Sequence, residues 1–308
     1  MIASPNHIRS LIRVAGLTAA LAIVELSPVL AQVPDTTKKP TPRDSAIVDT
    51  LQARAQRKVL REAHQIRLTD AALAVGGVAV LSLLDEPLQR ASQKHRRSHR
   101  GGTLTDLANG FRQQGEPIYY AGISLGVLAT GYIVNSAPIR RAGRRLVVSV
   151  AASALVEQTI KITLGRSRPN EGVGAFSFHP FSSRKDSTGL TARGSMPSGH
   201  VTAAFAVATS LADDIHNTPV KIALYTLASG TAFSRIYDNR HWFSDTAAGA
   251  ILGITTAKLV SGHWRLFGLK PPGWLVTPTG APALSWNVPF STSPSVPHLA
   301  TAESSATR

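Results

Sequence analysis

Hydrophobic positions along the chain gather into six apolar segments, which are separated by polar or strongly charged stretches. All six are rich in alanine and glycine, and none keeps the alternation of apolar and polar residues that marks a half-buried strand. Small residues allow helices to approach one another closely. We therefore expect an all-α fold, a six-helix bundle. The predicted helices cover residues 68–84, 117–134, 146–164, 198–212, 220–233 and 246–260.

The residues before the first apolar segment have the features of an export signal followed by a linker. Arg9 and Arg13 precede an apolar run that ends in a small-residue cleavage pattern, so residues 1–31 are predicted to be a signal peptide or an uncleaved anchor. Residues 32–67 are predicted to form a linker and then an amphipathic helix. Residues 263–308 are rich in proline and serine and are predicted to be a poorly structured tail.

The segment lengths leave open whether the bundle spans a membrane. Several segments have only fourteen to seventeen residues, fewer than the roughly 20 that a bilayer requires. If the N-terminus is exported and every segment spans, the basic cluster at 140–145 would lie outside, against the positive-inside rule. Two arrangements avoid this conflict: either the first segment does not span, or the bundle is a soluble periplasmic domain.

Composition narrows the classes of partner and of chemistry. The net charge of +15 over 308 residues favours anionic partners such as phosphates, nucleic acid or an anionic membrane surface. We expect no nucleic acid, because no basic motif interleaved with aromatic residues is present. The absence of cysteine excludes disulfides, thiolate catalysis and thiolate metal ligands.

The stretch between the fifth and sixth predicted helices combines a cation, an imidazole and a carboxylate. It reads Ser-Arg, five residues, His, three residues, Asp, and it contains Arg235, His241 and Asp245. Residues four apart lie on one face of a helix, so Asp245 can bind one ring nitrogen of His241 and leave the other free to attack. The guanidinium of Arg235 suits an anion. Taken alone, the stretch could also be a surface turn with a solvated ion pair.

Two further clusters lie at the ends of apolar segments. Six residues separate Lys161 from Arg168 around the end of the third segment, and Arg168 precedes a proline. Ser198, Gly199 and His200 open the fourth segment. A phosphate needs several donors, which a lysine, an arginine and the free N–H groups of a helix N-terminus supply together. His200 could protonate a leaving oxygen.

Each member of these clusters has a simpler interpretation. Lys161 could pair with Glu157 four residues earlier, Ser198 could be an ordinary N-cap, and His200 could be a core histidine. All of them lie at or beside the ends of apolar segments, however, and this favours one shared anion site. The loop over 170–196 either forms a wall of the substrate pocket or is an ordinary surface loop. Its candidate wall residues are Phe176, Phe178, His179 and Phe181.

On these motifs the chain resembles the type 2 phosphatidic acid phosphatase (PAP2) superfamily, which also holds bacterial acid phosphatases and vanadium haloperoxidases. The patterns K-x6-R-P, P-S-G-H and S-R-x5-H-x3-D all occur without a substitution. The resemblance implies a PAP2-like domain over 68–262, in which His241 is the nucleophile, Asp245 its orienting carboxylate and His200 the general acid. It implies neither a metal nor another cofactor. The implied phosphate-binding residues are Lys161, Arg168, Ser198, Gly199 and Arg235.

We therefore expect a phosphatase of the bacterial cell envelope, exported and membrane-associated, with its site facing the periplasm. It would hydrolyse a phosphomonoester or a terminal diphosphate, of a lipid in the first place, through a phosphohistidine intermediate. Phosphatidate, phosphatidylglycerophosphate, undecaprenyl diphosphate and lipid A all present the same group, so the motifs do not name the substrate. The motifs do not specify the oligomeric state either.

Three alternatives remain. The first is a soluble periplasmic acid phosphatase that acts on small phosphate esters. The second is a vanadium-dependent haloperoxidase, in which vanadate occupies the phosphate site and His241 ligates it. The third is a binding module with a non-functional site. This alternative does not explain why a nucleophile, an orienting carboxylate and an acid occur together.

Overall fold

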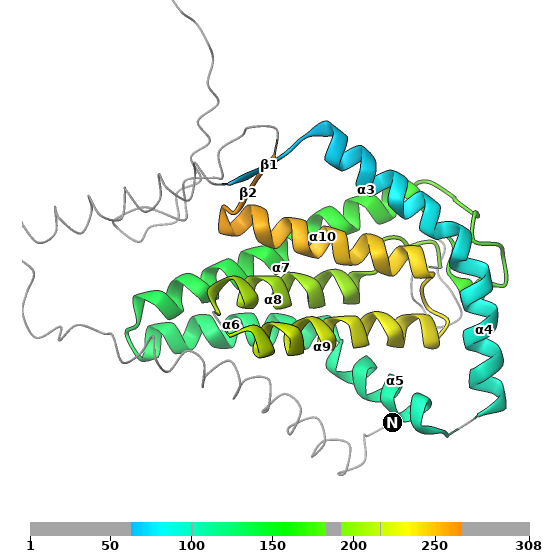
Figure 1. Cartoon of the computed structure of the whole chain (residues 1–308), viewed down its shortest axis with the longest axis horizontal. Helices are drawn as coiled ribbons and strands as arrows, with labels where there is room; N and C mark the ends of the chain where they lie inside the picture. The colour runs from blue at the N-terminus through cyan, green and yellow to red at the C-terminus, as the bar shows by residue number, and fades with distance from the viewer. Residues whose placement is uncertain (1–62, 100, 183–191, 216, 267–308) are drawn as a thin grey trace, which may run out of the picture. The chain divides into compact units, whose positions relative to one another are not determined.

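The computed structural model describes residues 63–99, 101–182, 192–215 and 217–266, and this part of the chain is mostly helical (Figure 1). Each of the six predicted segments contains a helix, so the all-α prediction is confirmed. These helices are α3 (Leu68–Leu81), which continues into the 3-10 turn η1 (Ser82–Leu84), α6 (Pro117–Ile133), α7 (Ala137–Leu164), α8 (Gly199–Asp214), α9 (Thr218–Tyr237) and α10 (Phe243–Ser261).

Local sequence explains several helix ends. Prolines stand in the first turn of α6, α7 and α9, where the missing N–H group costs no hydrogen bond. Gly165 ends α7 with φ +57°, a left-handed conformation that favours glycine. A side chain at Gly165 would also overlap the backbone carbonyl of His179. The chain therefore turns sharply after α7, and the loop that follows lies against the turn.

Helix α8 is the buried centre of the bundle, and it packs against α7, α9 and α10. Its contact with α10 is close because α10 presents glycines there. A Cβ atom at Gly249 would lie 2.7 Å from the carbonyl oxygen of Ser198, and one at Gly253 would overlap that of Thr202. This close approach places the N-terminus of α8 beside the N-terminus of α10.

Two helices between the first and second apolar segments were not predicted. They are α4 (Asp85–Ser98), which follows η1, and α5 (Thr103–Gln114). Both contact α9, and α4 runs across the end of the bundle where α9 ends and α10 begins (Figure 1). Their sequences are polar and charged, so a search for apolar runs does not detect them.

A short parallel pairing joins β1 (His64–Ile66) to β2 (Trp264–Leu266). The chain thus enters and leaves the described bundle at the same end. The helix predicted up to residue 67 is wrong over β1, because residues 64–66 pair with β2 instead. The part of that predicted helix before residue 63, the predicted signal over 1–31, and the tail beyond 266 lie outside the described residues, so the predicted domain boundaries stay predictions.

The outer surface of the bundle is apolar where α3, α6 and α7 form it. Two stretches, Leu68–Ser98 and Ala137–Leu164, are long and apolar enough to cross a membrane, and α6 is a shorter apolar helix. Only 11% and 22% of the apolar windows in the two longer stretches are buried. The core helix of a soluble protein would be mostly buried, whereas exposed apolar faces such as these are typical of contact with a membrane or with another protein. On these three helices the most exposed large apolar side chains are Leu68, Leu73, Val75, Ile118, Ile133 and Leu155.

Candidate active site

The three sequence motifs converge at one end of the bundle, where α7 and α9 end and α8 and α10 begin. Backbone hydrogen bonds hold the segments together. The Ser198 N–H donates to the Asp245 carbonyl at 3.0 Å, and the Arg168 N–H donates to the Ala192 carbonyl at 3.1 Å. A guanidinium N–H of Arg168 also donates to the carbonyl of Arg240 at 3.4 Å. Residues far apart in the sequence thus share one site, although their chemical roles stay predictions.

His241 is buried, with 3% of its surface exposed, and its Nδ1 lies 2.7 Å from the backbone oxygen of Ser195. A carbonyl only accepts hydrogen bonds, so Nδ1 carries the proton and Nε2 keeps its lone pair. Burial lowers the pKa of His241 to about 3, and the positive charges of Arg168 and Lys161 act in the same direction. The imidazole is therefore neutral at neutral pH, which is the form of histidine that can attack phosphorus.

The spacing had predicted that Asp245 orients His241 through a direct hydrogen bond. The structure shows no such bond. Asp245 Oδ2 lies 3.6 Å from His241 Nδ1, beyond hydrogen-bond range. The carboxylate accepts instead from Ser195 Oγ at 2.5 Å and from the Trp242 N–H at 2.9 Å. The reason is that α10 begins only after Trp242, so His241 and Asp245 do not share a helical turn. Ser195 connects the two, because its hydroxyl binds Asp245 and its carbonyl binds His241.

Lys161 pairs with Glu157 one turn earlier on α7, which is the simpler interpretation that the sequence had left open. The pair nevertheless lies beside the start of α8. A Cβ atom at Gly199 would come within 2.7 Å of Glu157 Oε1. Lys161 is therefore both an ion-pair partner and a neighbour of the second motif, and only glycine at position 199 leaves room for this arrangement.

Ser198 is the N-cap residue of α8, yet its side chain does not cap the helix. Its Oγ is buried and has no hydrogen-bond partner among the described residues. A buried hydroxyl without a partner is costly unless a ligand supplies one. Ser198 thus occupies the N-cap position without capping the helix through its side chain, and its role in phosphate binding stays a prediction.

His200 is not a core histidine, because 26% of its side chain is exposed and its Nε2 lies 3.4 Å from Glu116 Oε2. Burial lowers the pKa of His200, while the hydrogen bond and charge of Glu116 oppose that change. The same hydrogen bond lowers the pKa of Glu116. The sequence analysis did not single out Glu116. Like the other site residues, it lies directly beside the end of an apolar segment.

Arg235 is buried and lies 3.4 Å from Asp238 through its Nη2. Asp238 also faces Arg96 of α4 and Arg112 of α5, at 3.7 and 3.8 Å. The two unpredicted helices thus contribute cations around the third motif. Arg166, which no motif had singled out, is almost completely buried behind His241.

The loop after α7 turns back against that helix. The His179 N–H donates to the Gly165 carbonyl at 2.9 Å, and the ring of Phe178 lies under the guanidinium of Arg166 at 5.5 Å. Phe176 and Phe181 are exposed. Residues 183–191 of this loop lie outside the described part of the chain, so its predicted role as a pocket wall stays a prediction.

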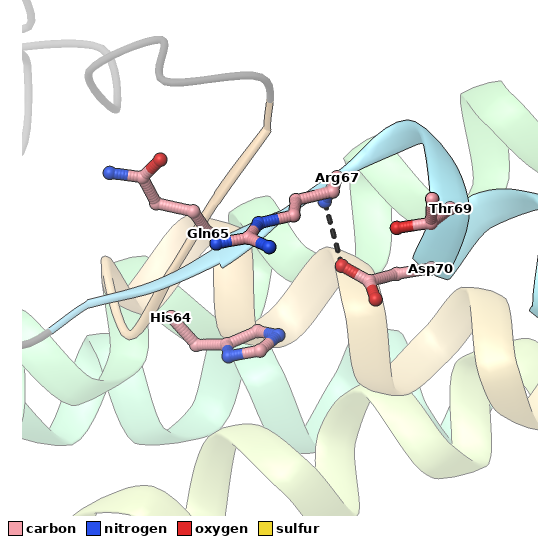
Figure 2. Close-up of a pocket in the computed structure, with 5 residues that line it drawn as sticks. All are labelled: His64, Gln65, Arg67, Thr69 and Asp70. Atoms are coloured by element: carbon pink, nitrogen blue, oxygen red, sulfur yellow. Dashed lines mark hydrogen bonds between the residues drawn. The ribbon is translucent and has the colours of Figure 1, made fainter.

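A separate pocket lies where β1 leads into α3, and Figure 2 shows its lining. Within it the Arg67 N–H donates to Asp70 Oδ2 at 2.7 Å. Because β1 pairs with β2 after the end of α10, this pocket lies at the opposite end of α10 from His241. None of the motif residues lines it. No group of three or more His, Asp or Glu side chains in the described part of the chain is arranged to hold a metal ion.

The sequence model of the PAP2 superfamily matches residues 142–266, which contain all three motifs. The predicted resemblance is therefore confirmed. A lipid A 1-phosphatase of Porphyromonas gingivalis is 46% identical over 76 residues, which are 24% of this chain and 17% of that protein. An acid phosphatase of Zymomonas mobilis is 42% identical over 73 residues, which are 24% of this chain and 27% of that protein. The match thus spans well under a third of either relative.

Two solved structures are similar to the chain. Aquifex aeolicus LpxE aligns with a TM-score of 0.43 and 19% identity, over 58% of this chain and 94% of that one. A transmembrane PAP2-type phosphatidylglycerolphosphate phosphatase of Bacillus subtilis aligns with a TM-score of 0.47 and 18% identity, over 62% of this chain and 94% of that one.

Proposed function

We propose that this chain, whose residues 142–266 match the PAP2 superfamily, is a phosphatase that acts on lipid phosphates through a phosphohistidine at His241. The observation that carries the proposal is the state of that histidine. It is buried and neutral, its Nδ1 proton is held by the Ser195 carbonyl, and the cations Arg168 and Lys161 act on it. A nucleophile whose Nε2 keeps its lone pair beside an anion-binding group is what phosphoryl transfer requires.

In the first step, Nε2 of His241 attacks phosphorus, and the bond between phosphorus and the leaving oxygen breaks. The electron pair of that bond goes to the leaving oxygen, and protonated His200 supplies its proton. In the second step, water attacks the phosphohistidine, neutral His200 accepts a proton from the water, and the P–N electron pair returns to Nε2. Inorganic phosphate is released, and His200 is protonated again for the next substrate.

The phosphoryl charge needs positive groups around it during both steps. Lys161, Arg168 and Arg235 would supply these charges, and the N-terminus of α8 would supply N–H groups at Ser198 and Gly199. The unpartnered Ser198 Oγ supports this assignment, because a phosphate oxygen would satisfy it.

A lipid substrate is favoured by the apolar outer faces of α3, α6 and α7. A bundle that contacts lipid with these faces would receive the headgroup of a membrane lipid at one of its ends. The relative named lipid A 1-phosphatase supports the same substrate class. The relative named acid phosphatase favours the second candidate, a phosphatase of small soluble esters.

We infer that the site faces the periplasm. The first turns of α7 carry four arginines, Arg140, Arg141, Arg144 and Arg145, whereas Lys161 lies near the other end of the same helix. Because α7 has 28 residues, the two ends are about 40 Å apart. Basic residues beside membrane spans favour the cytoplasm, so the site end would lie outside. This orientation puts β1 on the cytoplasmic side. Residue 32 could then lie in the periplasm only if the chain crosses the membrane between residue 32 and β1.

A phosphate-release panel tests the function. Phosphatidate, phosphatidylglycerophosphate, undecaprenyl diphosphate, lipid A and p-nitrophenyl phosphate would each be given to membrane and soluble fractions of expressing cells. We expect turnover of a lipid ester in the membrane fraction and none by His241→Ala. Phosphate release retained by His241→Ala would reject the mechanism, and faster turnover of p-nitrophenyl phosphate in the soluble fraction would support the second candidate.

A further inference from the structure

Behind His241, two carboxylates and one guanidinium form a buried ionic network. Arg166 Nη2 lies 2.7 Å from Asp85 Oδ2, and its Nη1 lies 2.6 Å from Asp245 Oδ1. All three side chains are no more than 1% exposed. Ser244 binds the same groups: its hydroxyl donates to Asp85 at 2.6 Å and accepts from Arg166 at 2.7 Å. The network is thus closed and well satisfied.

The network reaches the nucleophile through Ser195. Asp245 accepts from the Ser195 hydroxyl, and the Ser195 carbonyl holds Nδ1 of His241. The position of the imidazole therefore depends on Asp245, and the position of Asp245 depends on Arg166. Asp85 anchors Arg166 together with the Ala175 carbonyl, which accepts from Nε at 2.9 Å and from Nη2 at 2.8 Å. Asp85 also accepts from the Ser244 N–H at 2.7 Å.

The charges of the network suggest why a second carboxylate is present. Arg166 with Asp245 alone would be neutral, whereas Asp85 brings the network to one net negative charge. When Nε2 of His241 takes the phosphoryl group and Nδ1 keeps its proton, the ring becomes positively charged. A net negative charge nearby stabilises that cation, and the effect is strong because the groups are screened little by water.

We propose that Asp85 is a positioning residue for the phosphohistidine step: through Arg166 it holds Asp245, and its charge compensates the phosphorylated imidazole. The inference rests on the proposed function. Asp85 opens α4, lies outside residues 142–266 and belongs to none of the three motifs. It is separated by 156 positions from His241 and meets the network only because α4 crosses the end of the bundle.

The test compares Asp85→Asn and Asp85→Glu with wild type and with Asp106→Asn. Asp106 is a matched control, because it stands in the first turn of α5 but is exposed. The full chain would be purified in detergent, and rapid quenching would separate release of p-nitrophenol from hydrolysis of the phosphoenzyme. This substrate is chosen because its leaving group needs little help from an acid, so the first step reports on His241 and not on His200.

For Asp85→Asn we expect roughly a 10- to 100-fold slower release of p-nitrophenol, the range typical of losing an outer partner of a catalytic group. KM should change little, and the hydrolysis step should not slow, because a less stable phosphohistidine is a better phosphoryl donor. Asp85→Glu keeps the charge and should retain more activity than Asp85→Asn. Asp106→Asn should match wild type.

Equal slowing of both steps, or wild-type kinetics of Asp85→Asn, would overturn the inference. If Asp85→Asn does not fold, Asp85→Glu decides: a folded Glu variant whose first step is slowed 100-fold or more would show that the charge is not what matters. A wild-type protein that releases no phosphate from any ester of the panel would overturn the proposed function and this inference together. An active wild type with an inactive His241→Ala and a normal Asp85→Asn would overturn the inference alone.

Discussion

His241 and His200 have the same side chain, but their surroundings differ. His241 is enclosed and neutral, with Nδ1 held by a backbone carbonyl. His200 is partly exposed and faces the carboxylate of Glu116, which favours its protonated form. A pair of titratable groups in contrasting environments is a typical source of separate nucleophile and acid roles. We therefore propose the same two roles that the motif resemblance implies.

The pH profile should reveal His200. Its pKa is lowered from the ordinary value near 6.5, and the first step needs its protonated form, so kcat/KM should fall as pH rises through a value below 6.5. Glu116→Gln removes a hydrogen bond and a charge that raise this pKa, so the fall should move to lower pH. The measurement is kcat/KM against pH for dioctanoyl phosphatidate. Wild type and Glu116→Gln are compared on this one substrate, so that the ionisation of the substrate affects both profiles equally. A fall that stays in place or moves to higher pH would contradict the assignment of His200.

Gly199→Ala should weaken phosphate binding more than it weakens the fold. The new methyl group would meet the carboxylate end of Glu157, which can shift but would carry Lys161 with it. We expect a rise in KM of roughly tenfold, while the free energy of unfolding changes by only about 1 kcal/mol. Kinetics and thermal unfolding would be measured beside Gly110→Ala, a helical glycine with open space around it. An unchanged KM for Gly199→Ala would show that Lys161 does not bind the phosphate.

At the scale of elements, the contact between α8 and α10 determines whether the site forms. Both helices begin at the site, and their glycine-mediated contact keeps the two N-termini adjacent. Helices α4 and α5 then add Asp85, Arg96 and Arg112 from outside the motif region. In the proposed reaction the motif segments would supply the reacting groups, and the two polar helices would supply charges around them.

Gly253→Ala tests the contact between α8 and α10. Its methyl group would overlap backbone atoms of Thr202 and Ala206, which cannot move without shifting α8. We expect a loss of about 1–3 kcal/mol in stability, as for other overpacked cores, together with a lower kcat. Thermal unfolding and kcat would be compared with those of Gly76→Ala, where the added atom meets open space on α3. Equal melting temperatures of the two variants would mean that α8 and α10 tolerate a wider separation.

At the scale of the whole molecule, the described bundle has two distinct ends. One end carries the motifs and α4, and the other carries β1, β2 and the arginine-rich start of α7. The apolar faces of α3 and α7 lie between them. The difference between the two ends bears on how the bundle is oriented in a membrane, a question that the segment lengths alone had left open.

Single-cysteine labelling tests the orientation, because the chain has no cysteine of its own. Ser98→Cys lies at the site end and Ala137→Cys at the other, and both positions are exposed. In spheroplasts, a membrane-impermeant maleimide should label Ser98→Cys at once and Ala137→Cys only after permeabilisation. The reverse pattern would put the site in the cytoplasm. Labelling of both, with the protein in the soluble fraction, would indicate a soluble bundle.

The local sequence was sufficient to predict the six apolar helices and the three motifs at their ends. Apolar runs and fixed spacings are properties of neighbouring residues, so they can be read without knowing the fold. The same reasoning missed α4 and α5, whose polar sequences carry no such run, and it assigned β1 to a helix because its pairing partner lies 200 positions away.

Only the tertiary structure decided which groups act on one another. The spacing of His241 and Asp245 suggested a direct hydrogen bond, yet the structure places Asp245 Oδ2 3.6 Å from His241 Nδ1, and Ser195 bonds to both residues. Glu116 and Asp85 reach the site from helices that no motif includes. A residue's protonation and orientation depend on the burial and charge around it, and these are set by packing between distant segments. Residue identity and spacing therefore determined the available chemistry, and packing determined how those groups are arranged.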